Sequence, residues 1–530
     1  MFRWSFWRKV LIGFVVLIVL LAGFLAYRMK GPDRGYRVDL ALPVAGSGPV
    51  PGVLEVGVAM RDITPDLSRY DSWTDANDDG KFSEGDGDSW QDSNGNGKRD
   101  LVWMAGFSDN RPAKGVHDKL WARAIAFRNN GVTVAMVTID SIGILHEKFI
   151  TVRKNIDPSL KIDHVMFSTL HNHESPDTMG IWSNIDGVGA ILWKANFDYG
   201  YMALVQDACK QAVEEAVRAL QPADMTIAED TIEPDGFVDD SRLPLVYDLR
   251  ICSARFVKHG TDETIATMVS WGNHVETLGS TNSLLTSDFA HYLREGMEKG
   301  VGEPNGVEGF GGMSLYFQGM VGGLMTQLHT TVPHRDGVQK FEHGTFEKAQ
   351  ALGENVAIVA AKSLRGDAVT TSENSKVAVA AQTIFAPVSG MYGYAIALGL
   401  IHPGWYWGKA RTEVNAFCIG DLEILTIPGE LYPEIGEGGV EAPEGGDFPG
   451  EPIEVPPLRK QMRGKVNMVI GLANDEIGYI IPKTQWDVDP PFAYGRDKDQ
   501  YGEENSGGPD VAPVIHKEAL AVLERLHGLL

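Results

Sequence analysis

Two histidines one residue apart follow an apolar segment in the first half of the chain. His171 and His173 stand in the run Ser-Thr-Leu-His-Asn-His-Glu-Ser-Pro, shortly after the apolar residues 165–167. Side chains along a strand alternate between its two faces, so both imidazoles point to the same side if the strand continues. Paired imidazoles at the end of a buried strand suit metal binding or acid/base chemistry. The spacing alone leaves open two histidines hydrogen-bonded in an ordinary loop.

A second candidate site lies in residues 71–100, which are rich in Asp, Asn and Gly. Calcium prefers oxygen ligands, and alternate residues of a curling loop can all point inward. The EF-hand spacing is filled by the side chains of Asp75, Asn77, Asp79 and Asp86 and by the carbonyl of Lys81, with Gly80 at the sharp turn. A partial second copy runs from Asp92 to Asp100, and we find no other internal repeat. We expect a structural calcium ion here; a solvated acidic loop without an ion is the alternative.

Composition places the chain among ordinary globular proteins. Its 530 residues are 43% hydrophobic and 22% charged, with a formal net charge of −24. So acidic a chain lacks the basic footprint of a nucleic-acid-binding protein, and we expect no nucleic-acid partner. The three cysteines form no Cys-x-x-Cys pair, which excludes a cysteine zinc knuckle. A disulfide between Cys252 and Cys418 is left open by the sequence.

The N-terminus contains an uninterrupted apolar run at residues 10–26. Arg3, Arg8 and Lys9 precede it, and such flanking charge keeps the N-terminus in the cytoplasm. We therefore predict a signal anchor over residues 1–30, a linker over 31–54 and a single-pass membrane protein. Its catalytic domain is then extracytoplasmic, in the periplasm or at the cell surface. A cleaved signal peptide is the competing interpretation.

Strand and helix patterns alternate through the rest of the chain. Strands are predicted at 132–139, in the segment that leads to His171, and at 376–386, 413–427 and 465–471. Helices are predicted at 199–220, 345–365 and 515–529. Pro222 is expected to stop the first of these helices. The alternation predicts an α/β (mixed α+β) fold of layered β-sheets flanked by helices, in one large catalytic domain over 55–530.

Several separated segments share the motifs of one family. They are residues 56–65, 105–107, 115–124, 170–176, 271–274, 428–430 and 471–479. In this order they resemble the catalytic domain of the neutral/alkaline (non-lysosomal) ceramidases, over about residues 55–500. The resemblance implies a zinc ion bound by His171, His274, Glu430 and Tyr479, with His173 facing the substrate and Arg242 near it. The residues alone predict a different set, namely His171, His173, His274 and a carboxylate, because tyrosine is not a usual zinc ligand. For Arg242, an ordinary surface ion pair is the alternative.

The chain departs from the family pattern at the nucleophile. Met325 stands where the family has its serine, with Gly323 in place of a neighbouring Asp, and Thr326 lies one position away. We therefore expect zinc-activated water to attack an amide or ester carbonyl. Apolar stretches at 179–199 and 391–408 are candidate walls of an acyl groove, or plain core.

These features predict a membrane-anchored, zinc-dependent amidohydrolase that cleaves an N-acyl (sphingo)lipid or a related amide or ester. Its partners are then a lipid or acyl-amide substrate and the membrane, through the N-terminal helix. Two alternatives stay open: a hydrolase of a non-lipid acyl substrate, and a catalytically silent metal-binding relative.

Overall fold

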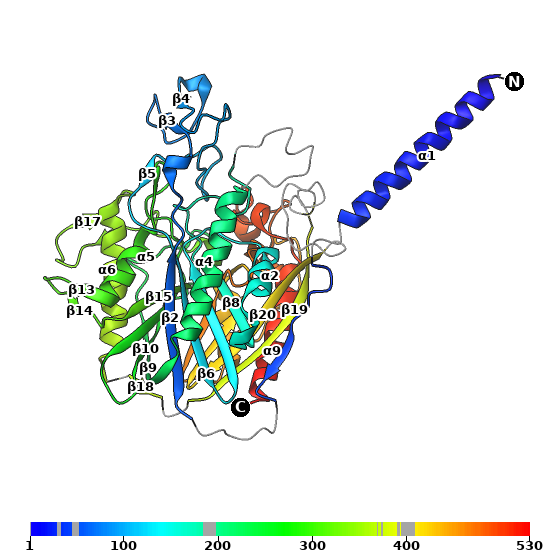
Figure 1. Cartoon of the computed structure of the whole chain (residues 1–530). Helices are drawn as coiled ribbons and strands as arrows, with labels where there is room; N and C mark the ends of the chain where they lie inside the picture. The colour runs from blue at the N-terminus through cyan, green and yellow to red at the C-terminus, as the bar shows by residue number, and fades with distance from the viewer. Residues whose placement is uncertain are drawn as a thin grey trace.

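Two stacked β-sheets form the centre of the molecule, and helices cover both outer faces (Figure 1). The computed structural model describes residues 2–28, 33–44, 52–183, 198–367, 369–372, 375–389, 393 and 409–530. Strands and helices interleave along the chain, and one large domain follows the N-terminal apolar helix. The predicted fold class is confirmed.

The larger sheet has nine strands. Eight of them follow the spatial order β15 (Met313–Gln318), β11 (Thr264–Trp271), β10 (Arg250–Lys258), β9 (Gln221–Thr231), β2 (Leu54–Asp62), β6 (Trp121–Asn129), β7 (Val132–Ile139) and β8 (His164–Thr169). The short β18 (Thr370–Thr371) pairs with β9 off this path. Pairing is antiparallel except at the two ends, where β11 and β15 run parallel, as do β7 and β8.

The smaller sheet has five strands, in the order β1 (Asp39–Leu42), β19 (Val377–Pro387), β20 (Lys409–Ile419), β21 (Leu422–Thr426) and β23 (Val466–Ile470). Within the described residues, five two-stranded ribbons complete the β structure: β3 (Ser72–Thr74) with β4 (Ser89–Gln91), β5 (Gly115–Val116) with β12 (Leu284–Leu285), β13 (Gly300–Val301) with β14 (Val307–Glu308), β16 (Val332–Pro333) with β17 (Lys340–Phe341), and β22 (Glu430–Leu431) with β24 (Tyr479–Ile480).

Strand β6 shows why the sheets stack in layers. Ile125 and Phe127 point into an apolar core shared with the smaller sheet, whereas Ala124 and Ala126 face the helices on the other side. This alternation follows from the two-residue period of a strand. The larger sheet is covered by α2 (His146–Asn155), α4 (Tyr199–Arg218), α5 (Asp288–Lys299) and α6 (Phe346–Ser363), and the smaller sheet by α8 (Pro433–Glu437) and α9 (Val511–His527). The result is a helix–sheet–sheet–helix sandwich.

The predicted elements agree with the structure in position, with three corrections. The segment 413–427 is two strands, β20 and β21, because Gly420 at φ 60° allows a tight hairpin turn. Helix α4 ends at Arg218, and Pro222 lies inside strand β9. Strand β8 ends at Thr169, so the alternation of an extended strand does not reach His171, whose φ is 59°.

The acidic insertion contains an internal repeat that the sequence interpretation described only as a partial second loop. Residues 71–83 and 88–100 share Asp-Ser-Trp, Asp, Asn and Gly-Lys at matching positions, and β3 pairs with β4 between them. Each copy begins with an aspartate that holds the loop of the other. Asp88 accepts hydrogen bonds from the backbone of Ala76 and Ser83, and Asp71 accepts them from Ser93 and Asp100. The two copies therefore form a reciprocal pair.

Helix α1 (Phe2–Arg28) is long and apolar enough to cross a membrane. Its apolar window Phe6–Phe24 has a mean hydropathy of 2.1, and none of that window is buried against the rest of the protein. A signal sequence near the N-terminus has the same properties. The cysteines Cys209, Cys252 and Cys418 are all buried and unpaired, so the Cys252–Cys418 disulfide does not form in this structure.

Candidate active site

The ends of four strands from both sheets meet at one point. His171 follows β8, His274 follows β11, Glu430 follows β21, and Tyr479 follows β23 after a loop. Glu430 and Tyr479 are then directly paired in the parallel ribbon β22–β24. Loops at strand ends are where a rigid scaffold can place reactive side chains together. The four residues implied by the family resemblance are therefore neighbours.

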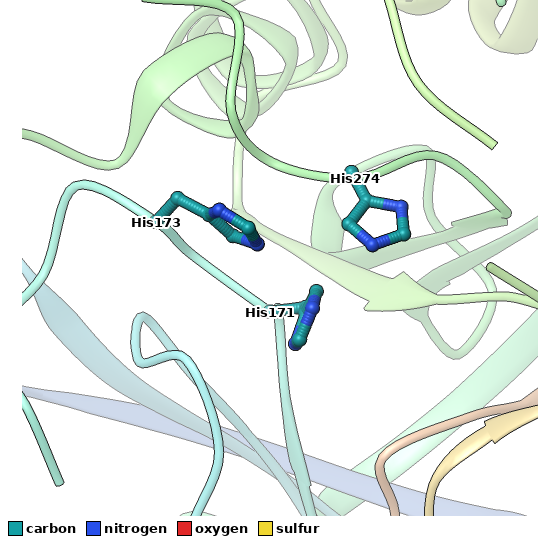
Figure 2. Close-up of side chains that lie close together, drawn as sticks. All are labelled: His171, His173 and His274. Atoms are coloured by element: carbon teal, nitrogen blue, oxygen red, sulfur yellow. The ribbon is translucent and has the colours of Figure 1, made fainter. Parts of the chain in front are cut away.

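The imidazoles of His171, His173 and His274 lie close to one another (Figure 2). Nδ1 of His171 lies 3.0 Å from the carbonyl oxygen of Ile142, and Nδ1 of His274 lies 2.8 Å from that of Met325. A carbonyl oxygen can only accept a hydrogen bond, so Nδ1 carries the proton in both rings. The Nε2 lone pairs are left for a metal, as in histidine ligands held by backbone carbonyls.

The Glu430 carboxylate completes this arrangement. Its Oε2 lies 3.4 Å from Nε2 of His171 and 3.2 Å from Nε2 of His274, and the Tyr479 hydroxyl lies 3.4 Å from the latter. Among the described residues, Oε2 of Glu430 has no hydrogen-bond partner of good geometry. A buried, unpaired carboxylate oxygen facing two imidazole nitrogens fits a bound cation.

His173 contributes a third imidazole. The ligand atoms of His171, His173 and His274 all lie within 4.8 Å of one another, so the three could hold a metal. Nδ1 of His173 lies 3.3 Å from Oε2 of Glu276, whose other oxygen accepts a hydrogen bond from Thr326. The structure thus brings together both predicted ligand sets, the one with Tyr479 and the one with His173.

A glycine makes room for this third ring. Gly106 has φ 107°, and a Cβ atom there would lie 2.4 Å from the ring of His173. Any larger residue would displace the imidazole. Gly106, in the motif segment 105–107, therefore contributes to the site by leaving room for the ring of His173.

Burial and neighbouring charges set the protonation of the cluster. Burial lowers the pKa of His171 to about 4, and burial together with the adjacent His171 lowers the pKa of His173 strongly. For His274 burial acts in the same direction, but the close contact with the Glu430 carboxylate and the charge of Glu276 outweigh it and raise the pKa to about 9. Burial alone would raise the pKa of Glu430, yet the two imidazoles hold it below its usual value. His171 and His173 are therefore neutral at pH 7, whereas His274 carries a second proton, on Nε2, that a bound metal would displace.

A cavity of about 210 Å³ opens beside the cluster. Its polar side is formed by His171, His173, Glu430, Glu476 and Tyr479, and its apolar side by Phe107, Ile142, Met179, Ile181 and Trp182. Tyr501 and Asn505 also line it. The predicted acyl-groove stretches are thus represented by residues 179–182. Residues 184–197 and most of 391–408 lie outside the described residues.

Met325 does not point into this cavity. Its side chain is fully buried in the apolar cluster between the larger sheet and helices α5 and α6, and only its carbonyl serves the site, through His274. Thr326 hydrogen-bonds to Glu276 and does not line the cavity in the described part of the chain. Neither residue is placed as a nucleophile.

Arg242 is buried, which contradicts the surface ion pair considered for it. Its guanidinium forms a two-point ion pair with Glu503 and donates to the carbonyls of Tyr501 and Gln485. Every terminal nitrogen is therefore engaged by protein groups, and Arg242 does not line the cavity. It acts on the site by holding the segment that carries Tyr501.

The loop predicted to bind calcium has the turns expected of its sequence. Asp75 accepts hydrogen bonds from the backbone of Asp79 and Gly80, and its Oδ2 lies 2.9 Å from the ammonium of Lys114. Gly80 adopts φ 76°, as the sharp turn requires. Asp86 is exposed, whereas Asp88 is buried and bonded to the loop backbone.

Comparison with known proteins gives structural neighbours only. No family model and no curated protein matches the sequence. The structure is similar to neutral ceramidase from Pseudomonas aeruginosa, with a TM-score of 0.61 at 15% sequence identity over 90% of this chain and 75% of that one. A ceramidase complexed with C2 gives a TM-score of 0.60 at 15% identity, over 89% and 76%. The chain has a ceramidase-like fold. At this identity the likeness establishes the fold, and the activity must be argued from the site.

Several residues in and around the site were not predicted from the sequence, among them Glu276, Glu476 and Asp177. Glu276 lies two positions after His274, and Glu476 lies three before Tyr479, so both were within reach of predicted ligands. Asp177 accepts hydrogen bonds from the backbone of Met179, Gly180, Trp182 and Ser183 and from the Ser183 hydroxyl. The sequence could have indicated this turn, because an Asp directly after a proline, here Pro176, is typical of turns.

Proposed function

We propose that this chain is a membrane-anchored, zinc-dependent hydrolase of N-acyl compounds, acting on an N-acyl (sphingo)lipid or a related amide or ester. One observation carries the proposal: four side chains from distant segments, His171, His274, Glu430 and Tyr479, converge on one point beside a cavity with an apolar wall. The ceramidase-like fold supports the same reaction class.

These four residues would hold the zinc ion. Bound there, zinc would polarise a carbonyl oxygen and lower the pKa of a coordinated water. The fit is supported by the donor set: Nε2 of both imidazoles faces the Glu430 carboxylate, and Oε2 of Glu430 has no hydrogen-bond partner among the described residues.

The chain's other residues would position the substrate and move protons. His173 has Nδ1 beside Glu276, which leaves Nε2 for the cavity, where it can take a proton from water and return it to the leaving amine. Glu276 fixes the orientation of that ring. The apolar wall, including Phe107 and Trp182, would bind the acyl chain and exclude water.

The test combines metal analysis with an acyl-substrate screen on the full chain in detergent. We expect one zinc ion per chain, hydrolysis of at least one N-acyl lipid or small amide, and loss of both zinc and activity in His171→Ala. Zinc without activity on any acyl compound would favour the catalytically silent relative. Turnover confined to small amides would favour a non-lipid substrate.

We propose that α1 is an uncleaved anchor that leaves the catalytic domain outside the cytoplasm. Support comes from its apolar window and from the basic residues Arg3, Arg8 and Lys9 before it. N-terminal sequencing of protein extracted from membranes should find the original N-terminus, and added protease should reach the domain from the outer side. A mature N-terminus after the helix would contradict the anchor.

We propose a structural calcium ion in the loop formed by Asp75, Asn77, Asp79, Lys81 and Asp86. The loop turns in the manner such a site needs, and the Lys114 ammonium already pairs with Asp75, as a cation would. Calorimetry should detect calcium binding that is lost in Asp75→Ala and Asp79→Ala. No measurable heat in the unmodified protein would end this proposal.

A further inference from the structure

Glu476 lines the cavity beside the candidate metal ligands. Its side chain is 5% exposed, and Oε1 accepts a hydrogen bond from the backbone N–H of Gly478 at 2.8 Å. Among the described residues Oε2 has no hydrogen-bond partner. Buried polar atoms in folded proteins are nearly always paired. The unpaired oxygen of this cavity-lining residue therefore indicates that a polar group of the ligand forms the missing hydrogen bond.

The backbone is shaped to hold Glu476 at this place. A Cβ atom on Gly143 would lie 2.8 Å from Cγ of Glu476 and 2.7 Å from Sδ of Met179. The missing side chain lets the carboxyl group stand directly beside the apolar wall. Glu476 thus lies at the boundary between the polar and apolar sides of the cavity.

The charge of the cavity limits what can meet Glu476. Two carboxyl groups, those of Glu430 and Glu476, line the cavity, and within the described part of the chain no Lys or Arg does so. Burial and the charge of Glu430 raise the pKa of Glu476 well above its usual value, so its carboxyl group is neutral and has no need of a cationic partner. A hydroxyl group can instead pair with the open oxygen.

We propose that Glu476 is a specificity-determining residue. Its Oε2 forms a hydrogen bond with a hydroxyl group on the amine side of an N-acyl substrate. The apolar wall formed by Phe107, Ile142 and Trp182 suits the acyl chain of the substrate. The amine part of the substrate is therefore assigned to the polar side of the cavity, where Glu476 lies. This inference rests on the proposed hydrolase function.

Three compounds with the same acyl chain separate the contributions: N-octanoyl ethanolamine, N-propyl octanamide and N-octanoylglycine. They differ only in a hydroxyl, a methyl or a carboxylate at the end of the amine part. We would measure kcat/KM on the full chain in detergent, and dissociation constants by calorimetry on chelator-treated protein, so that binding is read without turnover. The variants are Glu476→Leu and Glu476→Gln. The control is Glu147→Gln, since Glu147 is also buried with one unpaired oxygen but lies on α2, outside the cavity.

The unmodified protein should prefer the ethanolamine compound to the other two by about tenfold or more. Glu476→Leu should lose the preference for hydroxyl over methyl. Glu476→Gln should keep it, because its amide oxygen can accept the same hydrogen bond. The control should leave all ratios unchanged. If Glu476→Leu fails to fold, the ratio of the hydroxyl to the methyl compound in the unmodified protein still decides, because a ratio near one overturns the role of Glu476.

The outcomes distinguish this inference from the hydrolase proposal. A binding preference that depends on Glu476, without turnover, would end the hydrolase proposal and leave the role of Glu476 intact. Turnover with no preference for the hydroxyl compound would overturn the role of Glu476. A preference that persists in both variants would overturn it as well.

Discussion

Among single residues, the chemistry of the cavity depends on which ring nitrogens are free. The carbonyl oxygen of Ile142 accepts a hydrogen bond from Nδ1–H of His171, and that of Met325 accepts one from Nδ1–H of His274. Both rings therefore turn Nε2 toward Glu430. The ring of His173 faces a carboxylate, Glu276, in place of a carbonyl, so its environment differs from that of the other two.

This difference predicts separate roles for His173 and Tyr479. His173→Ala should retain zinc and lose about 10²-fold or more in kcat, because it removes a proton-transferring group. Tyr479→Phe should instead weaken zinc binding, because it removes a ligand. Zinc content after dialysis, measured beside kcat, separates the two. If His173→Ala releases zinc while Tyr479→Phe keeps it, the three-histidine ligand set is the right one.

Substitution of Met325 tests whether position 325 can contribute to the reaction. Met325→Ser places the family's residue type at its aligned position, yet the side chain points into a packed apolar cluster. We expect the variant to lose about 2–4 kcal/mol of stability, from a cavity and a buried hydroxyl, and to gain no activity. Urea unfolding and kcat/KM are the measurements. An increase in kcat/KM would mean that position 325 can reach the substrate.

In the elements that carry the site, strands could be predicted from the sequence and loops could not. The strand 132–139 was predicted with its correct bounds, because a run of β-branched and apolar residues has one interpretation. The pairing of Glu430 with Tyr479 in β22–β24 could not be derived, since two-residue strands carry no periodic signal. Convergence of His171 and His173 was predicted for a partly wrong reason, because the chain turns at His171 after the strand has ended.

The turn 177–183 forms part of the apolar wall of the cavity, and its stability can be tested. Asp177 holds this turn, which presents Met179, Ile181 and Trp182 to the cavity. Asp177→Ala leaves several backbone N–H groups without their acceptor, so the apolar wall should loosen. We expect KM for acyl substrates to rise about tenfold or more while zinc content stays unchanged.

Asp157→Ala is the matched control for this turn. Asp157 also accepts a backbone hydrogen bond in a short turn, from Ser159, but it lies outside the cavity. Its substitution should leave KM unchanged. Equal KM values for Asp177→Ala and the unmodified protein would show that the wall does not depend on Asp177.

For the whole molecule, the sequence predicted the class of fold but not the stacking of its sheets. Interleaved strand and helix patterns were sufficient for layered sheets with flanking helices, because each pattern is local. Strand order depends on contacts between distant segments, such as β1 with β19 and β2 with β9, for which one sequence holds no signal. The repeat at 71–83 and 88–100 was present in the sequence and was underestimated, because its meaning depends on the pairing of β3 with β4.

A buried polar network joins the two sheets. Glu413 on β20 of the smaller sheet pairs with Arg153 on α2 and with His164 on β8 of the larger one, at 2.7 and 3.2 Å. Burial opposes its ionisation, but Arg153, His164 and His146 together outweigh burial and hold the pKa of Glu413 well below its usual value. His146 lies 3.8 Å from the same carboxylate, and burial lowers its pKa to about 4. Both groups therefore bind protons more weakly in the folded protein than in the unfolded chain.

This network predicts that acid destabilises the domain. As pH falls below about 6.5, the unfolded chain protonates the His146 imidazole while the folded protein resists, so the free energy of unfolding decreases until pH reaches about 4. The shift corresponds to about 3 kcal/mol at most. In His146→Asn, which keeps a donor for the carbonyl of Asn474 but cannot titrate, this part of the loss should be absent. Urea unfolding of both proteins at pH 7, 5.5 and 4 measures the difference, and equal slopes would mean that His146 does not carry the effect.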